Sequence, residues 1–485
     1  MKKIWNELKA GKFFVCVCVA LVLLAPQGCK KDPEQPSYTG INDWILEEMS
    51  IYYLWNTQIP RRTNKTLYPK DYFESLLYKA EDRFSWIQEN FFELREYLSG
   101  ITTEAGYEFN LFLTQDNNHL VYGYIAYIKP GTPAETAGLK RGDFFSSING
   151  TAMTMSNYQS LLGQISKPHT IGKMILSSQG GFTGQTTNVS LSVIKYEENP
   201  ILLDTIYRIE SKKIGYFVYN LFARDSEEDG IAYELELNNL FGKYKAESID
   251  ELIIDLRYNS GGAVVTADAL ASMISNRGAK DVISYIQYNS FLDQYFTKEE
   301  GKDYNKSMFL DYIDDRVKIN KLTNLERLHL IVTNRTASAS EMIINCLRPY
   351  MEVVLVGDST VGKNVGSISI YEREEAKQKT NTWAMQPIVA KFENAEHFSD
   401  YGKGFPPDVK VNELEIGMRQ LGDIEELMLA AALDHIFGKK TTLQRKNTAL
   451  NVKIVGSSID RNPARRNMYI SRPAVFAMPP CNTGE

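Results

Sequence analysis

Cysteine is scarce in this chain, with five among 485 residues. A chain of this length with so few cysteines is not a disulfide scaffold, so core packing is expected to hold it together. No apolar stretch reaches the roughly 20 residues that a membrane-spanning helix needs. An excess of positive charge is also missing, because the formal net charge is −6. This charge argues against a nucleic-acid partner, which needs a basic surface.

The bulk composition is typical of globular proteins, with 43% hydrophobic and 24% charged residues. The length exceeds what a single hydrophobic core usually covers, so about two to four domains are expected.

Residues 1–28 are predicted to be a targeting segment. Four lysines precede an apolar run over 13–24, and the run APQGC follows at 25–29. A glycine before a cysteine at this place resembles a bacterial lipoprotein cleavage site, with Cys29 as the lipidated residue. A plain secretory signal is the alternative. We therefore expect an exported protein in the cell envelope, lipid-anchored to the outer membrane on its periplasmic or surface side.

Segment 29–39 is predicted to be a polar linker, and 40–100 a small helical domain. Apolar and aromatic residues recur there at helical spacing, among them Ile45, Met49 and Tyr52. The tail 439–485 lacks periodicity, and we assign it no function.

Strand-like patterns begin near residue 101. Within 124–153 a strand ends at a Pro-Gly pair, a short helix follows, and a later strand closes at an Asn-Gly turn. Residues 101–196 resemble a PDZ domain, which binds the last residues of a peptide as an added strand. The loop that would hold the peptide carboxylate contains Gly106, Tyr107, Glu108 and Phe109. The alternative is that this module is only a spacer or lid.

Residues 197–438 alternate buried strands with helices, which indicates an α/β layered core. The predicted strands cover 214–222, 251–256, 329–334 and 351–357, and two of them run into helices at 263–274 and 339–348. Segment 275–327 is polar and aromatic, and we expect it to be an irregular insertion over the site.

Two short motifs in this core carry nucleophilic chemistry without histidine. TASASE at 336–341 places Ser338 at the start of a helix, where backbone N–H groups favour negative charge. STVGKNVGS at 359–367 supplies Lys363, whose flanking residues carry no acid, so burial could lower its pKa enough to make it a base. The oxyanion would be held by the N–H groups of Ala339 and of Gly261 or Gly262.

Structural roles are the alternative to catalytic roles for these residues. Ser338 with Glu341 three positions later is also a capping-box pattern, and Ser340 is a second candidate nucleophile. The five histidines, at 119, 169, 329, 397 and 435, lie in no serine-hydrolase motif. His329 is expected to pack in the core, and Asp255 is expected to pair with Arg257 in a structural role.

The segments IIDLRYNSGG (253–262), TASASE and VGKNVGS (361–367), in this order behind a PDZ-like module, resemble the carboxy-terminal processing (tail-specific) serine peptidases. The lipoprotein signal fits the Bacteroidota type, and GFPPDVKV at 404–411 fits the family as well. The resemblance implies a ClpP/crotonase-like peptidase core with a PDZ-like β-domain upstream and a small N-terminal helical domain. It implies a dyad of Ser338 and Lys363. Two departures stand out, since Ser367 replaces a common glutamine that supports the base, and Pro349 replaces a common aspartate.

The predicted function is an exported serine endopeptidase that recognises C-terminal tails of protein substrates and cuts them with a Ser-Lys dyad. Its partners would be protein or peptide substrates and, through the lipid anchor alone, the membrane; no cofactor or metal is expected. One alternative is a catalytically weak envelope PDZ scaffold. Another is an acyl-group enzyme of the crotonase type, although no coenzyme-A-binding signature is present.

Overall fold

The computed structural model describes residues 37–114, 117–176, 182–224, 230–372, 381–415, 417–439, 452–461 and 468–470. The predicted signal segment and Cys29 lie outside these residues. Within the described ranges, no helix combines the length and the apolar character needed to cross a membrane.

The core is built on a six-stranded sheet. Its strands, in spatial order, are β10 (Ile201–Ile209), β11 (Lys212–Tyr219), β12 (Glu251–Asp255), β18 (Arg327–Val332), β19 (Glu352–Gly357) and β24 (Val409–Lys410). All neighbours from β11 to β24 pair in parallel, and β10 joins β11 as an antiparallel hairpin. The predicted α/β layering is confirmed, and the central strands are buried along nearly their whole length, as parallel strands covered on both faces should be.

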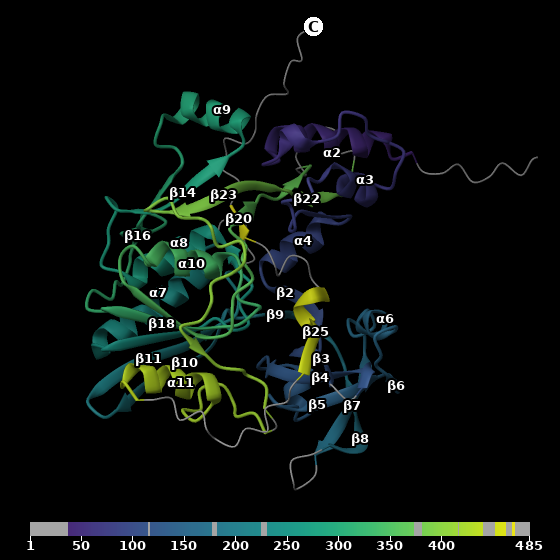
Figure 1. Ribbon diagram of the computed structural model, residues 1–485, viewed down its shortest axis with the longest axis vertical. Helices are drawn as coiled ribbons and strands as arrows, with labels where there is room; N and C mark the ends of the chain where they lie inside the picture. The colour runs from purple at the N-terminus through teal and green to yellow at the C-terminus, as the bar shows by residue number, and fades with distance from the viewer. Residues whose placement is uncertain are drawn as a thin grey trace, which may run out of the picture.

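Helices cover both faces of this sheet, as Figure 1 shows. One face packs against α7 (Ala232–Glu247), α8 (Val264–Ile274) and α10 (Ala339–Leu347), and the other against α11 (Leu427–Ile436). Successive strand residues point to opposite faces, so Leu330 joins the cluster with α8 and α10, and Ile331 the cluster with α11. The start of α10 is therefore held at the carboxyl end of β18 by a continuous core.

A second sheet has the order β13 (Gly262–Ala263), β26 (Met468–Tyr469), β20 (Val365–Ser367), β23 (Ile388–Asn394), β14 (Val282–Tyr288), β15 (Lys306–Met308). The expectation of an irregular insertion at 275–327 is wrong, because β14 pairs with β23 and leads into helix α9 (Ser290–Glu300). The cap residue of α9, Asn289, donates to the carbonyls of Ile51 and Tyr53 in the N-terminal domain. The insertion therefore supports that domain and does not line the cavity at Lys363.

The N-terminal domain consists of α2 (Thr39–Tyr52), α3 (Pro69–Leu76), β1 (Trp86–Gln88) and α4 (Phe91–Leu98). The predicted apolar stripe is buried and belongs to the same cluster as α8 and α10 of the core. Strand β1 pairs antiparallel with β22 (Ala384–Gln386). Shared packing and strand pairing thus fix residues 82–86 against the core.

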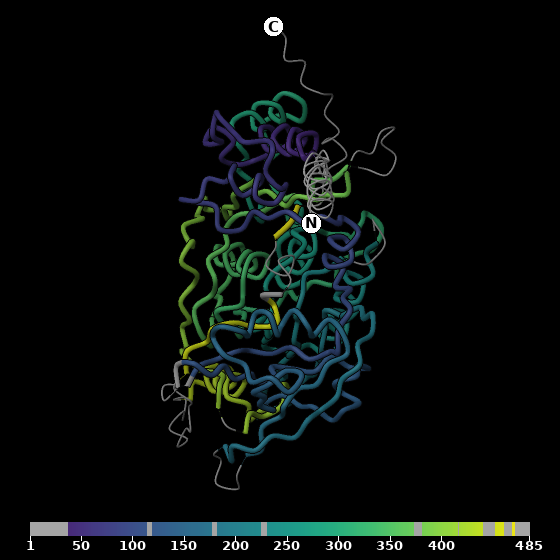
Figure 2. Tube along the Cα trace, turned by 90° about the vertical axis from the view of Figure 1, so that its right-hand side faces the viewer, coloured from purple at the N-terminus to yellow at the C-terminus, as the bar shows by residue number. Residues whose placement is uncertain are grey.

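The β-domain is a sheet of β3 (Tyr107–Thr114), β4 (Asn117–Ile128), β5 (Phe144–Ile148), β7 (His169–Leu176) and β8 (Phe182–Leu191). Asn149 and Gly150 both have positive φ, at 50° and 75°, as the predicted hairpin turn requires. The edge next to β3 is occupied by β25 (Val452–Ser457), which comes from the C-terminal tail. In Figures 1 and 2 the yellow tail lies against the blue β-domain, so part of this tail is regular structure.

Candidate active site

Ser338 lies at the turn between β18 and α10 in a strained backbone conformation. Its φ is 66° and its ψ −120°, a region that costs a serine about 1–3 kcal/mol. Ser338 and Glu341 face each other as in a capping box. The buried Ser338 hydroxyl nevertheless has no hydrogen-bond partner of normal geometry within the described part of the chain. A strained turn that presents an unpartnered hydroxyl is an arrangement expected of a nucleophile.

Lys363 is buried, with 1% of its surface exposed. Burial lowers the pKa of its ammonium group from 10.5 to about 7, although the Asp82 and Glu341 carboxylates act in the opposite direction. Desolvation therefore dominates over nearby negative charge. At neutral pH about half of the Lys363 side chains would be neutral amines able to accept a proton.

Glu341 connects the serine turn to the lysine loop. One of its carboxylate oxygens accepts the backbone N–H groups of both Ser338, at 2.9 Å, and Lys363, at 2.7 Å. The other accepts the Thr360 hydroxyl at 2.5 Å and the Gly362 N–H at 2.6 Å. Because the two backbones share one oxygen, residues 25 positions apart in sequence are held beside each other.

The N-terminal domain supplies the wall around Lys363. The Phe84 ring lies 4.9 Å from the Lys363 Nζ, and Arg83 donates to the Gly362 carbonyl at 2.9 Å. Asp82 accepts the Tyr53 hydroxyl and the N–H groups of the next turn, which fixes this segment.

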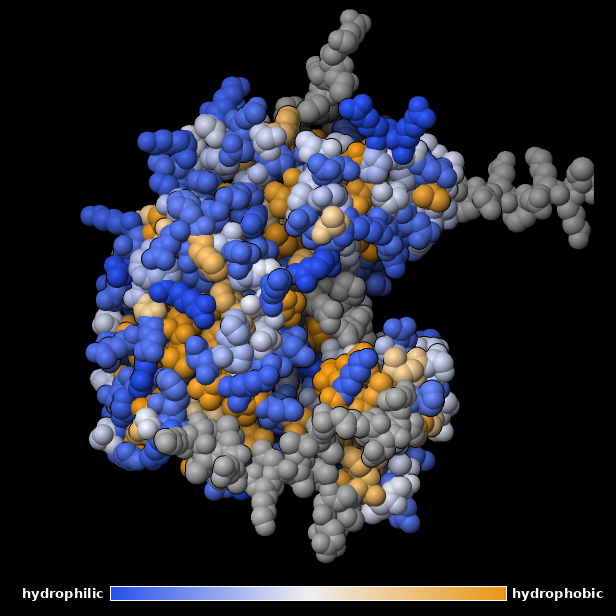
Figure 3. Space-filling model, viewed as in Figure 1, coloured by the Kyte–Doolittle hydropathy of each residue, from blue (hydrophilic) through white to orange (hydrophobic). Residues whose placement is uncertain are grey.

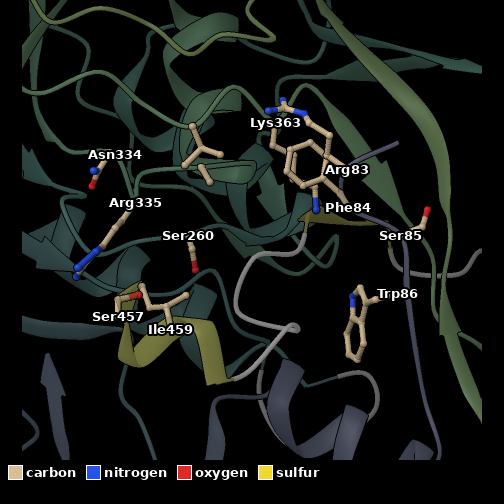
Figure 4. A pocket seen from close by; sticks show the side chains of 12 residues that line it. Arg83, Phe84, Ser85, Trp86, Ser260, Asn334, Arg335, Lys363, Ser457 and Ile459 are labelled. Carbon is tan, nitrogen blue, oxygen red and sulfur yellow. The ribbon is translucent and has the colours of Figure 1, made fainter. Parts of the chain in front are cut away.

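A cavity of about 550 Å³ opens beside these groups and is within the size range of ligand pockets. Figure 4 shows Lys363 and Phe84 on one side of it and Ser457 and Ile459 of the tail on the other. In Figure 3 the surface is hollowed between the N-terminal domain and the β-domain. The cavity itself has room for a segment of a peptide beside the Lys363 side chain.

The glycine pair predicted for the oxyanion site adjoins Ser338. Gly261 has φ +108°, and a Cβ there would lie 2.5 Å from the Ser338 Cβ, so no other residue fits. The Gly261 N–H is donated to Asn259 Oδ1 at 2.9 Å. At Gly262, φ is +142° and a Cβ would collide with the Phe222 carbonyl. Of the predicted donors, Ala339 and Gly261 therefore adjoin the serine, whereas Gly262 packs against Phe222 and the Gly261 N–H is donated to Asn259.

Ser367 is buried on β20 and donates to Gln386 Oε1 at 2.7 Å or to the Met468 carbonyl at 3.2 Å. Gln386 in turn donates to Ser369 at 2.5 Å. The family pattern has a glutamine at position 367. In this chain the Gln386 amide, which comes from strand β22, lies beside that position.

The histidines are engaged elsewhere. His329 and His435 bond each other at 3.0 Å, and burial lowers the pKa of His329 to about 3. His169 contacts the Tyr107 hydroxyl at 2.9 Å, and His397 contacts Glu393. Among the described residues, no histidine hydrogen-bonds the Ser338 hydroxyl. The core position expected for His329 is confirmed.

The pairing of Asp255 with Arg257 is also confirmed. Arg257 Nη2 lies 2.7 Å from Asp255, and Nη1 lies 2.7 Å from Glu426. Arg141 of the β-domain reaches the same Glu426 at 3.3 Å and Glu413 at 2.9 Å. This buried ion network links the β-domain to the core near the carboxyl end of β12.

The fold and the site define a class, an α/β peptidase fold that carries a PDZ domain. Residues 213–411 match Peptidase family S41, residues 40–86 match the Peptidase S41 N-terminal domain, and residues 124–170 match a PDZ domain. Region 213–411 thus belongs to peptidase family S41, with the N-terminal domain of that family and a PDZ domain before it.

Named relatives agree with this assignment. The Carboxyl-terminal-processing protease of Picosynechococcus sp. is 24% identical over 306 residues, which cover 63% of this chain and 64% of the relative. The Carboxy-terminal processing protease CtpA of Bacillus subtilis is 24% identical over 292 residues, 59% of this chain and 53% of the relative. The chain thus spans between about half and two thirds of these relatives. A crystal structure of a putative S41 protease from Bacteroides fragilis has a TM-score of 0.64 at 25% identity and covers 81% of this chain and 97% of its own.

Several site residues were not predicted from the sequence. Glu341 was visible as a capping pattern, but its contact with the lysine loop was not. Asp82, Phe84 and Gln386 come from segments whose local patterns indicate only packing or strands. No local signal could have placed them at the site, because each reaches it through tertiary contacts.

Proposed function

We propose that this chain is an exported serine endopeptidase that takes up C-terminal tails of protein substrates and hydrolyses peptide bonds within them. Ser338 is the nucleophile and Lys363 the general base. The observation that carries the proposal is the shared Glu341 oxygen, which holds the strained serine turn beside a buried lysine whose pKa is near neutrality.

The neutral Lys363 amine takes the proton of the Ser338 hydroxyl while that oxygen attacks the scissile carbonyl carbon. The negative charge that develops on the carbonyl oxygen is stabilised by the N–H of Ala339 and by the amino end of α10. The Gly261 N–H joins them only if it leaves Asn259 Oδ1. The Lys363 ammonium then returns the proton to the leaving amine. Water attacks the acyl-enzyme with the same lysine as base, which restores the serine.

Lysine suits this task because its environment disfavours the charged form. Phe84 and the buried wall remove water from the ammonium group, while the Glu341 carboxylate accepts the backbone N–H of Lys363. The Ser338 hydroxyl and the lysine must approach for the reaction, and catalytic hydrogen bonds often tighten only when substrate is bound.

The PDZ domain and the N-terminal signal support the remaining parts of the proposal. The edge of β3 pairs in this structure with β25 of the chain's own tail, and an extended substrate peptide would add there as a strand in its place. The sequence around Cys29 supports export and a lipid anchor in the cell envelope. Cys29→Ser should then move the protein from membrane to soluble fractions.

A fluorophosphonate probe, which reacts with activated serines, tests the chemistry. It should label the wild-type protein and fail to label Ser338→Ala, and Lys363→Ala should lose most labelling. Lys363→Arg should not restore it, since arginine does not give up its proton. Ser340→Ala is the matched control, because the Ser340 hydroxyl donates to the Asn259 carbonyl at 3.1 Å and is otherwise uninvolved. Unchanged labelling of Ser338→Ala or Lys363→Ala would overturn the dyad, and absence of labelling of the wild-type protein would favour a scaffold.

A further inference from the structure

The chain's own tail lies in the groove where a substrate peptide would bind. Strand β25 pairs antiparallel with β3, with Val452 opposite Thr114 and Ser457 opposite Asn110. Its carboxyl end therefore points toward the loop at Gly106–Phe109, which is the direction of a bound C-terminal peptide. Val455 packs against the apolar core of the PDZ domain, a cluster that includes Leu161 and Leu162.

Ser458 occupies the position expected for a terminal carboxylate. Its hydroxyl oxygen accepts the Phe109 N–H at 3.0 Å, and its proton is donated to the Glu108 carboxylate. A carboxylate in this place could accept from Phe109 but could not donate to Glu108. The Phe109 N–H and the Glu108 carboxylate are thus both hydrogen-bonded by one hydroxyl group, which can donate and accept.

The charge around this loop disfavours a free chain end. Lys129 is buried against three carboxylates, those of Glu104, Glu108 and Glu198, at 2.7, 2.9 and 2.8 Å. Beside Ser458 lies a further cavity of about 250 Å³ whose lining includes Glu93, Glu96, Glu104 and Glu108. One buried cation against several carboxylates leaves negative charge, which would repel the carboxylate of a peptide C-terminus.

The same tail reaches the catalytic side of the molecule. Ser457 and Ile459 line the cavity at Lys363. Further along, β26 lies between β13, which follows the glycine turn, and β20, which follows Lys363. Met468 is fully buried there, and the Ile470 N–H donates to the Ser367 carbonyl at 2.9 Å. The described parts of the tail are therefore anchored at both the groove and the catalytic sheet.

We propose that the β3 groove binds a substrate tail through an internal, hydroxyl-bearing segment of that tail rather than through its terminal carboxylate, and that Val452–Ser458 is the resident ligand of this groove. Substrates with an aliphatic residue three positions before a serine would enter by displacing it. Only the displacement of the tail by substrates rests on the proposed peptidase function. As a tethered ligand, the tail competes at an effective concentration in the millimolar range, so it would weaken binding of a separate peptide on the order of tenfold or more.

Binding is measured on the full chain carrying Ser338→Ala, with a fluorescent peptide of sequence LNVKIVGSS, residues 450–458. The peptide is made with a free carboxylate and with a C-terminal amide. The amide form should bind several-fold more tightly than the acid form. Glu108→Gln should narrow this difference, because it removes one negative charge at the peptide end. Tighter binding of the acid form would overturn the recognition claim.

Displacement is tested by changing the tail in the same chain. Val455→Asp places a charge against the apolar core of the PDZ domain and should raise the affinity for the added amide peptide at least tenfold. Ile454→Asp is the matched control, because the Ile454 side chain is 38% exposed, and it should change the affinity less than twofold. Val455→Gly removes the same packing without adding charge and should give a gain in the same direction.

Equal affinities for the Val455 and Ile454 variants would overturn the resident-ligand claim. All these measurements use a protein without the catalytic serine. If the wild-type protein failed to react with the fluorophosphonate probe, the proposed function would be refuted, but the peptide affinities measured here would not change.

Discussion

Replacing Lys363 by methionine should abolish activity and at the same time stabilise the folded protein. The reason is the pKa of this buried ammonium group, which burial lowers from 10.5 to about 7. This difference corresponds to about 5 kcal/mol of free energy against the charged form in the folded state. Methionine has a similar length and carries no charge, so the variant avoids this cost.

The effect has a defined dependence on pH. The unfolded chain keeps Lys363 protonated up to pH 10.5, whereas the folded chain releases the proton near pH 7. The unfolded state therefore binds more protons between these values, and the stability of the wild-type protein rises with pH across this window. Lys363→Met should be more stable by up to about 5 kcal/mol below pH 7. Its advantage should shrink as the pH approaches 10.5.

Urea unfolding at pH 6.5 and at pH 9.5 measures this difference, with Lys79→Met, a change at an exposed lysine, as the control. The control should alter stability by less than about 0.5 kcal/mol at both pH values. Fluorophosphonate labelling of the wild-type protein should rise with a midpoint near pH 7, because the reactive form has a neutral lysine. A methionine variant that is less stable than the wild type at pH 6.5 would refute the argument that desolvation governs this lysine.

Three further changes test the neighbourhood. In Glu341→Gln one acceptor oxygen remains where two carboxylate oxygens now accept four hydrogen bonds. The free energy of unfolding measured in urea should fall by about 3–6 kcal/mol, and fluorophosphonate labelling should be lost. His329→Ala, if folded by circular dichroism, should keep its fluorophosphonate labelling; a folded but unlabelled protein would place the base on this histidine. Arg83→Met removes the hydrogen bonds to the Gly362 and Gly402 carbonyls and should lower the labelling rate while the tail-peptide affinity stays constant.

Local sequence was sufficient for the elements around the serine. A buried apolar strand followed by a turn and a largely apolar helical run identifies the β18–α10 connection, and Ser338 is the N-cap residue of that helix. Glycines with no room for a Cβ, such as Gly261, are likewise a local requirement of the chain path. The order of these motifs was therefore readable before any contact was known.

Tertiary structure decided the electrostatics of the site and the secondary structure of two segments. The pKa of Lys363 depends on burial beneath Phe84 and on charges from Asp82 and Glu341, and Phe84 and Asp82 lie in another domain. Strand β14 within 275–327 and strand β25 of the tail pair with strands far away in sequence. Strand β25 lies at a sheet edge, and β14 lies between β23 and β15, so the hydrogen bonds of both strands are completed by partners that the local pattern does not reveal. Sequence alone thus determined which groups can react, and only the folded chain determined how they are charged and what lies in the groove.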